Sequence, residues 1–553
     1  MQSRTHAAPA APSRIGARLA PLAAALLATP LFAQTVREDA ALAPLAPTAA
    51  GEFGVAVDID GERAVVGAHL DDTLAPDAGA VFVFERASDG SWSEVAKLLA
   101  GDAGDSDNFG QAVALHGDRI LVGAWRDDEA GNDAGAAYVF ERQTGGAWLE
   151  VAKFTPSSGV GAAQFGKAVA LDGDHALVGA AFDSVGGAAS GAADLYERQS
   201  GGGWSEVAKL EASDEGFGDR FGNAVAIDGD RALVGAVNES PMNLFGAGSA
   251  YLFERQSGGA WTEVTKIVAA DAAVTDAFGF AVDLDGDRAL VAARQDDDGV
   301  ANSGSVYVLE RQGDASWSQT AKLQATAPAS GVEFGFCVRL DGDRAAVSAP
   351  LDSDGVAYLY ERRPDGTWFD VAQPVATAAA DGGTFGTGLA LSDGRLAAGA
   401  PGVDTAGPSA GGAWIFETRA LLHGAATISL ASGGAQSLHL RAGPERAGEL
   451  FVMLGSATGI APGAVDPASG VLVPLVVDAY MLALISGGGA GVVGPFVGVL
   501  DADGGAEAAF GLPAGSSPAL AGTVVHHAFL TIDLFGVGLA TSASSPARVE
   551  LVP

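Results

Sequence analysis

Residues 109–154 read FGQAVALHGDRILVGAWRDDEAGNDAGAAYVFERQTGGAWLEVAKF, and this stretch decides the fold. Four short runs in it are rich in apolar, β-branched or aromatic residues, at 112–115, 120–124, 136–142 and 148–154. Tight turns at Gly117 and Gly145 and one polar loop at 125–133 separate the runs. Runs divided by such turns predict four antiparallel strands. The stretch lacks the 3.6-residue apolar period of a helix.

The same pattern occurs seven times along the chain. Each copy begins with a Phe-Gly pair, at Phe53, Phe109, Phe165, Phe221, Phe278, Phe334 and Phe385, and successive pairs lie 51 to 57 residues apart. A four-stranded unit repeated at this period predicts an all-β fold, a seven-bladed β-propeller. We expect the Phe to fill the space between blades and the Gly to allow close backbone approach. A Trp in the fourth run of six copies is expected to pack the outer strand.

The seventh copy, residues 385–417, ends after three predicted strands. The segment 39–45 stands before the first Phe-Gly pair, where a fourth strand belongs. Leu42 lies 11 residues before Phe53, an interval that the second copy repeats. We therefore expect residues 39–45 to complete blade seven, because closing the ring removes an open sheet edge.

Three motifs of the repeat carry a family resemblance: Phe-Gly-x-Ala-Val-Ala, Gly-Asp-Arg-x-Leu-Val-Gly-Ala and Gly-Ala-Ala-Tyr-Val-Phe. Together they resemble the FG-GAP repeats of the integrin alpha-subunit propeller, in particular its secreted bacterial branch, over residues 36–420. The resemblance implies a seven-bladed propeller of the extracellular adhesion or ligand-binding type. Calcium-binding members carry Asp-x-Asp-x-Asp-Gly between strands one and two. This chain has Asp-Gly-Asp-Arg there, a turn too short to surround calcium with six or more oxygens.

The loops between the second and third predicted strands are acidic and emerge on the same face as the links between blades. Their candidate calcium or cation ligands are Asp71, Asp72, Asp127, Asp128, Asp296, Asp297 and Asp298. One interpretation is weak calcium binding or capture of a cationic partner. The other is a set of solvated loop tips that keep the protein soluble, because these carboxylates have no fixed ligand spacing.

The composition narrows the class of partner. The chain has 553 residues, with 31 Lys and Arg against 68 Asp and Glu, a formal net charge of -37. This balance argues against nucleic-acid binding, which needs a basic surface. The single Cys337 cannot form an internal disulfide, and its apolar neighbours predict that it packs as a small hydrophobe.

Residues 1–33 have the features of a secretory signal peptide: Arg4, Arg14 and Arg18 precede an apolar run at 19–27. We expect a secreted or cell-surface protein that does not insert into a membrane after signal removal. Beyond the propeller, residues 424–553 lack the repeat and contain apolar runs separated by turns. They predict a small C-terminal β-sandwich.

These observations predict a secreted, monomeric, non-enzymatic binding or adhesion protein with an extracellular protein or glycan ligand. No cofactor is required, and calcium is a candidate ligand. Two alternatives stay open: a carbohydrate-active enzyme and a structural repeat protein of the cell envelope. The enzyme needs convergent carboxylates near the propeller axis, one with a raised pKa. The first strands, expected nearest the axis, consist mostly of Ala, Val and Leu, which favours binding over catalysis.

Overall fold

The computed structural model describes residues 36 and 38–418, apart from 158–160, 185–188, 299, 364, 377–382 and 406. Beyond Thr418 it describes the backbone of nine strands. The chain forms two compact units that divide between Glu417 and Thr418. The one helical element in the described part is the 3-10 turn η1 (Pro241–Asn243). A membrane-spanning helix, long and apolar, does not occur among the described residues.

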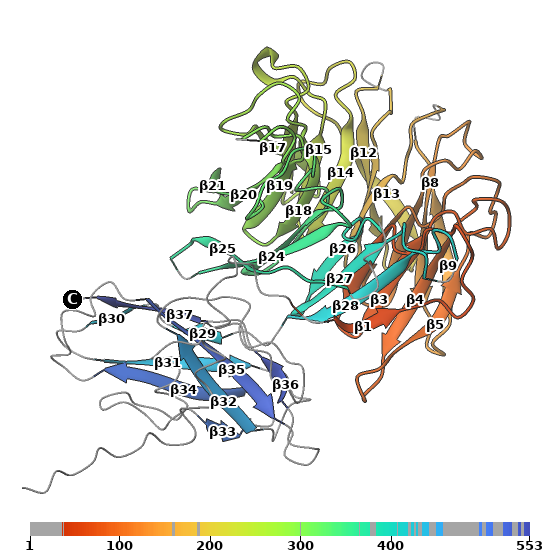
Figure 1. Cartoon of the computed structure of the whole chain (residues 1–553). Coiled ribbons are helices and arrows are strands. Elements are labelled where there is room, and N and C mark those ends of the chain that lie inside the picture. Colours follow the sequence, from red (N-terminus) through yellow and green to blue (C-terminus); the bar gives the residue numbers. More distant parts are fainter. Residues whose placement is uncertain are drawn as a thin grey trace, which may run out of the picture. The chain divides into compact units, whose positions relative to one another are not determined.

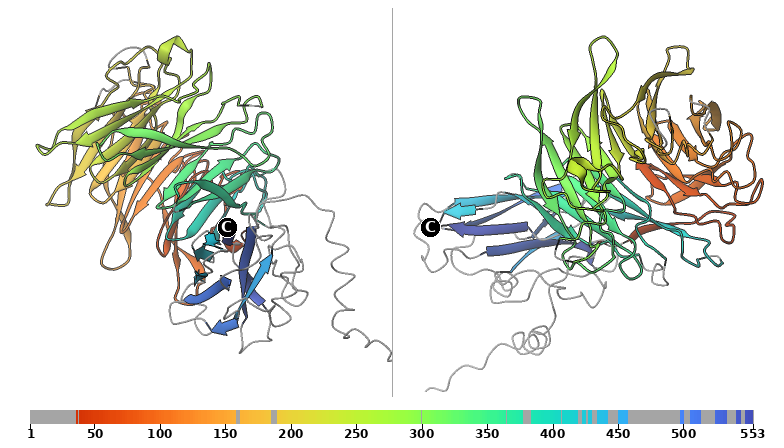
Figure 2. Two further views of the ribbon diagram at one scale, coloured as in Figure 1. Left: turned by 90° about the vertical axis from the view of Figure 1, so that its left-hand side faces the viewer. Right: turned by 90° about the horizontal axis from the view of Figure 1, so that it is seen from above.

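The first unit consists of seven four-stranded antiparallel sheets, the predicted blades (Figure 1, Figure 2). Blades one to three contain β2 (Val57–Asp60), β3 (Arg63–Ala68), β4 (Ala80–Arg86), β5 (Trp92–Leu98), β6 (Ala112–His116), β7 (Arg119–Ala124), β8 (Ala136–Arg142), β9 (Trp148–Phe154), β10 (Ala168–Asp172), β11 (His175–Ala180), β12 (Ala192–Arg198) and β13 (Trp204–Leu210). Blades four to six contain β14 (Phe221–Asp228), β15 (Arg231–Ala236), β16 (Ser249–Arg255), β17 (Trp261–Ile267), β18 (Phe278–Asp285), β19 (Arg288–Ala293), β20 (Ser305–Arg311), β21 (Trp317–Leu323), β22 (Val338–Asp341), β23 (Arg344–Ala349), β24 (Val356–Arg362) and β25 (Trp368–Ala372). Blade seven contains β26 (Leu389–Ser392), β27 (Arg395–Ala400), β28 (Gly412–Glu417) and β1 (Glu38–Leu42).

The first strand of every blade contacts the first strands of both neighbouring blades, including β2 with β26. These seven strands therefore form the innermost ring around the propeller axis. The antiparallel order places the tight turns between strands one and two, and between strands three and four, at one end, called the turn-side end. The loops between strands two and three and the links between blades lie at the other end, called the link-side end.

The N-terminal strand closes the ring. β1 pairs antiparallel with β28, and Leu42 lies opposite Ala413. At the turn-side end, Arg395 of blade seven donates a hydrogen bond from Nη1 to the carbonyl oxygen of Gly61 in blade one, at 2.8 Å. The strand expected at 39–45 is thus found at Glu38–Leu42, in the place where the sequence puts it.

The Phe-Gly pairs are scaffold, as the repeat predicts. Phe109 is fully buried, and its ring meets those of Tyr138 and Phe140 edge-on at 5.4 and 5.9 Å between centroids. Gly110 has φ +93°, and a Cβ there would lie 2.6 Å from the carbonyl oxygen of Ala80. No larger residue fits this approach between blades one and two.

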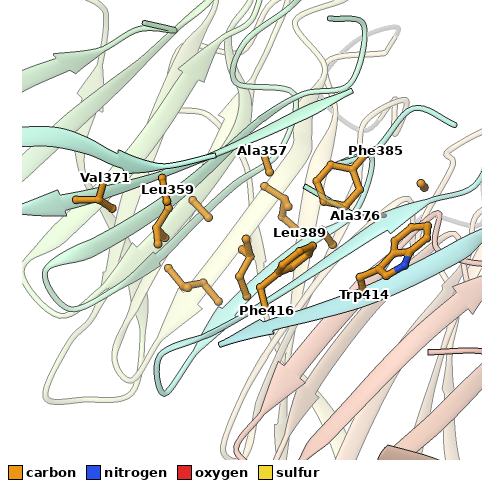
Figure 3. Packing of buried hydrophobic residues seen from close by; sticks show 14 of the residues in the cluster. Ala357, Leu359, Val371, Ala376, Phe385, Leu389, Trp414 and Phe416 are labelled. Atoms are coloured by element: carbon orange, nitrogen blue, oxygen red, sulfur yellow. The ribbon is translucent and has the colours of Figure 1, made fainter. Parts of the chain in front are cut away.

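Apolar side chains fill the space between neighbouring blades. Figure 3 shows one such cluster, in which Leu359 and Val371 of blade six meet Leu389, Trp414 and Phe416 of blade seven. Burial of this apolar surface is what holds adjacent blades together.

The tight turns between strands one and two also join blades, a role that turn geometry alone does not reveal. The Gly117 N–H donates to Asp60 Oδ2 of the preceding blade at 2.6 Å, and Arg63 Nη1 donates to the Gly117 carbonyl oxygen at 2.6 Å. Arginines at the same position repeat the second contact at Arg119, Arg231, Arg288 and Arg395. In the seventh turn Asp393, with φ +52°, takes the left-handed position that Gly takes elsewhere.

The strands after Thr418 form two sheets. One contains β29 (Leu422–Gly424), β31 (Gly434–Arg441) and β34 (Gly505–Leu512). The other contains β30 (Thr427–Ser429), β37 (Ala547–Val552), β35 (Val524–Ile532), β32 (Leu450–Ser456), β33 (Val497–Val499) and β36 (Ala540–Ala543). Their packing as a sandwich stays a prediction, and the proposed signal peptide, residues 1–33, lies outside the described residues.

Candidate functional site

Three of the predicted cation ligands are buried, and each pairs with the fourth-strand lysine of its own blade. The pairs are Asp71 with Lys97 at 2.9 Å, Asp127 with Lys153 at 3.0 Å, and Asp296 with Lys322 at 2.8 Å. The lysine recurs in the repeats, but it lies 26 residues after the acidic residue in sequence. The pairing is therefore evident only in the folded blade.

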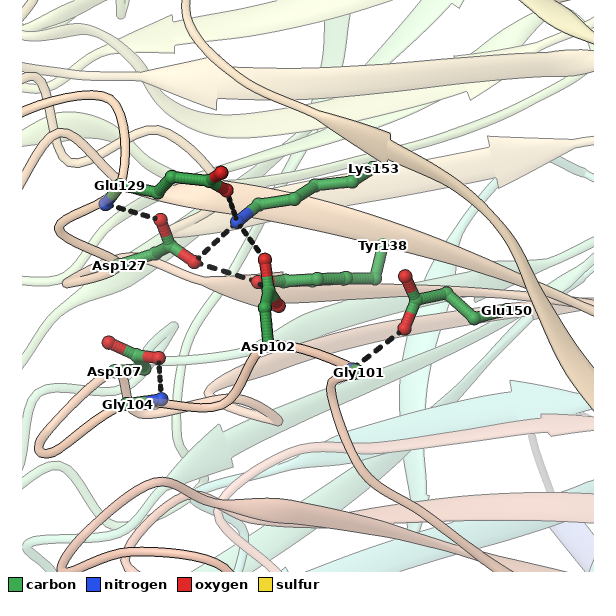
Figure 4. A network of polar contacts seen from close by, with 9 residues as sticks. All are labelled: Gly101, Asp102, Gly104, Asp107, Asp127, Glu129, Tyr138, Glu150 and Lys153. Carbon is green, nitrogen blue, oxygen red and sulfur yellow. Dashed lines mark hydrogen bonds and ion pairs between the residues drawn. The ribbon is translucent and has the colours of Figure 1, made fainter.

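Blade two shows the complete network (Figure 4). The single hydroxyl hydrogen of Tyr138 is shared between the carboxylates of Asp102 and Asp127, whose oxygens lie 2.9 and 2.7 Å from the hydroxyl oxygen. Lys153 contacts both carboxylates and Glu129. Burial opposes the charge of Lys153, but these three carboxylates raise its pKa above the usual value. The ammonium of Lys153 thus offsets part of the negative charge of the acidic loop and of the link that precedes the blade.

Blade five holds a similar group, which is the arrangement closest to a metal site among the described residues. Carboxylate oxygens of Asp271, Asp296 and Asp298 lie within 4.8 Å of one another. The ammonium of Lys322 lies among them, at 2.7, 2.8 and 2.6 Å. An ammonium ion therefore stands where a metal cation would have to bind.

The remaining predicted ligands close their own loops. Each accepts a backbone N–H from the residue five positions later: Asp72 from Asp77 at 2.8 Å, Asp128 from Asp133 at 2.6 Å, and Asp297 from Asn302 at 2.7 Å. All seven predicted ligands thus have internal partners, and calcium binding by them stays a prediction.

Charged residues also stand on the innermost strands, where the sequence analysis expects mostly Ala, Val and Leu. One position, opposite the middle of the second strand, is Ala in four blades (Ala114, Ala170, Ala226 and Ala390). The same position is Asp58 in β2, Asp283 in β18 and Arg339 in β22. We call these three residues the axial charges. They correct the expectation of an apolar inner ring for blades one, five and six.

The axial carboxylates have perturbed protonation. Burial raises the pKa of Asp58 to about 6, against the opposing effects of Arg339 and of two backbone N–H groups. One of these is the N–H of Leu115 in the next blade, which donates to Asp58 Oδ2 at 2.6 Å. Asp283 has the same environment: burial raises its pKa to about 6, and it accepts the Leu340 N–H at 2.6 Å.

A second group lies at the link-side end of the first and second strands of the blades. Lys167 precedes β10, Arg220 precedes β14 and Arg294 follows β19. We call these three residues the link-side cations. The side chain of Lys167 is exposed to solvent. The pKa of its ammonium is nevertheless lowered, mainly because surrounding protein excludes water and to a smaller extent because Arg220 and Arg294 are also positive. The three cations thus belong to the adjacent blades three, four and five and stand at the same end of them.

Aromatic rings hold the link-side cations. Lys167 Nζ lies 5.7 Å from the Trp125 ring, Arg220 Cζ lies 4.8 Å from the Phe182 ring, and Arg294 Cζ lies 3.8 Å from the Phe280 ring. Phe336 of blade six lies 5.6 Å from Phe280. Distances below about 6 Å are those of favourable cation–π contacts. Arg294 also pairs with Glu333 at 2.8 Å.

Sequence reasoning missed both groups because it followed the positions where the copies agree. The signal lies in positions where they differ. The residue after each Phe-Gly pair is Val55, Gln111, Lys167, Asn223, Phe280, Phe336 and Thr387. A comparison of the copies at such positions shows that the side chains at the link-side end differ from blade to blade, whereas the rest of each blade is regular.

Comparison with known proteins identifies the repeat. Six stretches match the family described as FG-GAP repeat, at residues 37–84, 92–140, 148–196, 204–253, 261–309 and 317–360. No curated protein matches the chain. Among solved structures, the Bombyx mori GH32 beta-fructofuranosidase BmSUC1 is similar at 13% identity, covering 66% of this chain and 87% of that chain, with a TM-score of 0.28.

Proposed function

Because the chain belongs to the FG-GAP repeat family, we propose that it is a secreted, monomeric binding or adhesion protein without enzymatic activity. Its ligand is an extracellular glycan or protein that contacts the link-side end of the innermost strands. A placement in the secreted bacterial branch of the family is part of this proposal.

One observation carries the proposal: at the link-side end the blades differ in cations and aromatic rings that blade packing does not require. Buried Phe and Gly positions repeat because every blade needs the same packing. Lys167 and Arg220 occur once each at their positions in the repeat. Phe280 and Phe336 share one position in the adjacent blades five and six, and their ring centroids lie 5.6 Å apart. Binding sites combine aromatic surface with a few placed polar groups, which is what this end offers.

Binding of the purified full-length chain to an array of glycans and extracellular matrix proteins tests the proposal. Phe336→Ala removes a half-buried ring of the link-side end and is expected to abolish binding. The control is Leu149→Ala, which removes an exposed apolar side chain from the outer strand β9 and should leave binding unchanged. Absence of any binding by the wild type, or equal binding by both variants, contradicts the proposal.

A carbohydrate-active enzyme is the second candidate, and the axial charges are the observation that favours it. Asp58 and Asp283 are carboxylates on the innermost strands with pKa values raised to about 6. A carboxyl group with a raised pKa is what a general acid requires. Release of reducing ends from a polysaccharide panel, lost in Asp58→Asn and Asp283→Asn, supports this candidate. No release by the wild type rejects it.

A further inference from the structure

We propose that the ligand is a sugar bearing an isolated carboxylate or sulfate group, and that Lys167, Arg220 and Arg294 receive this oxyanion. The inference rests on the proposed binding function and names the chemistry of its ligand.

The first support is the manner in which these cations are held. Most lysines and arginines of the described propeller contact carboxylates, which cancel their charge. Lys167 and Arg220 have no described carboxylate within 4.0 Å. Lys167 lies on the Trp125 ring and donates a hydrogen bond to the neutral amide oxygen of Gln164 at 3.5 Å, and Arg220 lies on the Phe182 ring. An aromatic ring orients a cation without neutralising it, so the positive charge stays available to an anion.

The second support is mutual repulsion. Lys167, Arg220 and Arg294 stand at the same end of the adjacent blades three, four and five, so three like charges gather there. Burial, followed by the two guanidinium groups, lowers the pKa of Lys167. An oxyanion placed among them relieves this repulsion and accepts charge-assisted hydrogen bonds. Of the three cations, only Arg294 forms an ion pair with a described carboxylate, that of Glu333.

The third support is the charge of the rest of the molecule, which selects an isolated anionic group. The chain carries a net charge of -37, and its link-side loops are acidic. This field repels a polyanion or an acidic protein surface. One carboxylate or sulfate on an otherwise neutral glycan meets the three cations and little of that repulsion.

The fourth support is the apolar surface beside the cations. Phe336 is half-buried and stands 5.6 Å from Phe280, whose own ring contacts Arg294. A sugar ring has an apolar C–H face that packs on an aromatic ring while its polar substituents point away. A site with rings and cations side by side therefore suits an acidic sugar better than an inorganic anion.

Calorimetric titration of the full-length chain tests the inference with two probes: a tetrasaccharide ending in glucuronate and its counterpart ending in glucose. We expect the glucuronate probe to bind at least about tenfold more tightly, and added salt to remove the difference. Lys167→Gln and Arg220→Gln should each weaken glucuronate binding by about tenfold. Arg363→Gln is the matched control, because Arg363 also lies on an aromatic ring, that of Phe369, but at the turn-side end; it should bind as the wild type does.

The outcomes separate this inference from the proposed function. Equal binding of both probes, unaffected by Lys167→Gln and Arg220→Gln, overturns the anionic ligand while binding itself stands. Binding of a peptide carboxylate without binding of the glucuronate probe overturns the sugar. A sulfate-ended probe that binds with the same dependence on Lys167 supports the inference and identifies sulfate as the group received. A chain that binds nothing on the array overturns the proposed function, and this inference with it.

Discussion

Arg395 in the last blade and Gly61 in the first are 334 residues apart in sequence and are joined by a 2.8 Å hydrogen bond. The side chain of Arg395 is 3% exposed and also contacts Glu417 at 2.6 Å. This one arginine thus ties the turn-side end of blade seven to the turn between β2 and β3 of blade one.

Arg395→Ala should destabilise the protein more than the same change at an equivalent arginine inside the ring. We expect a loss of roughly 2–3 kcal/mol, the scale of hydrogen bonds to a buried charged group. Arg119→Ala is the control, because Arg119 makes the same contact to Gly173 but is 24% exposed. Urea unfolding of both variants measures the difference, and equal losses would contradict a special role in closure.

Deletion of residues 38–42 should lower the melting temperature strongly, because it exposes the edge of β28 and opens the ring. Calorimetry of the truncated and full-length chains measures the shift. A deletion of residues 2–33 alone serves as the control and should leave the melting temperature of the propeller unchanged. An unchanged melting temperature after loss of 38–42 would show that closure by β1 is not needed.

Lys322→Met should convert the blade-five carboxylates into a calcium-dependent group. Without the ammonium, Asp271, Asp296 and Asp298 repel one another, and stability should fall by on the order of 2 kcal/mol. Added calcium should restore it, since three carboxylates then face one open position. Thermal shift with and without calcium is the measurement.

The matched control for Lys322→Met is Lys209→Met. Lys209 contacts two carboxylates, those of Asp183 and Asp194, so its loss should destabilise the chain without making it responsive to calcium. If calcium stabilised the wild type as much as it stabilises Lys322→Met, the ammonium would not be occupying the cation position.

The axial carboxylates predict an unusual pH dependence. A carboxyl group with a folded-state pKa near 6, above its ordinary value of 3.8, binds protons more tightly when folded. Its contribution to stability therefore improves as pH falls from about 6 toward 4. Asp58→Asn should raise the free energy of unfolding relative to wild type at neutral pH, and this advantage should shrink at acidic pH.

Urea unfolding of wild type and Asp58→Asn at neutral and acidic pH measures this difference. Asp118→Asn, at an exposed turn-side carboxylate, is the control and should show no such change. An advantage of Asp58→Asn that did not depend on pH would argue against a raised pKa at the axis.

Alanine substitutions at two glycines distinguish the cost of a steric clash between blades from the cost of backbone strain in a turn. Gly110→Ala places a Cβ 2.6 Å from a backbone oxygen at φ +93°, whereas Gly117→Ala at φ +58° meets no atom within 4 Å. The second change should cost only about 1–2 kcal/mol of backbone strain, and the first clearly more. Chemical denaturation measures the loss in free energy of unfolding for both variants. Equal losses would mean that the blades can move apart enough to admit the Cβ without loss of stability.

The regular part of the fold was predictable because the same sequence pattern occurs in seven copies. The buried Phe, the Gly beside it and the fourth-strand Trp recur at fixed spacing, so each copy confirms the others. The closing strand was predictable because blade seven lacked its own.

The candidate site was less predictable, because its residues depart from the repeat. Asp58, Asp283 and Arg339 look like random substitutions until the innermost strands are arranged in a ring. Asp71 lies in the loop between β3 and β4, and its partner Lys97 lies in the strand β5, so the carboxylate-rich loop gives no sign of the pairing in sequence. Residues that face one another across a closed ring have no fixed separation along the chain.

The strand supplied by the N-terminus has a consequence for how the propeller is made. In an open stack of repeats, each unit adds its own increment of stability and the array can grow or fray from either end. Here β1, which precedes all the other blade strands in sequence, has no partner until β28 of the last blade exists. The chain must bear the entropy of joining two distant segments before blade seven is complete. The seven blades should therefore fold and unfold cooperatively, as one closed ring.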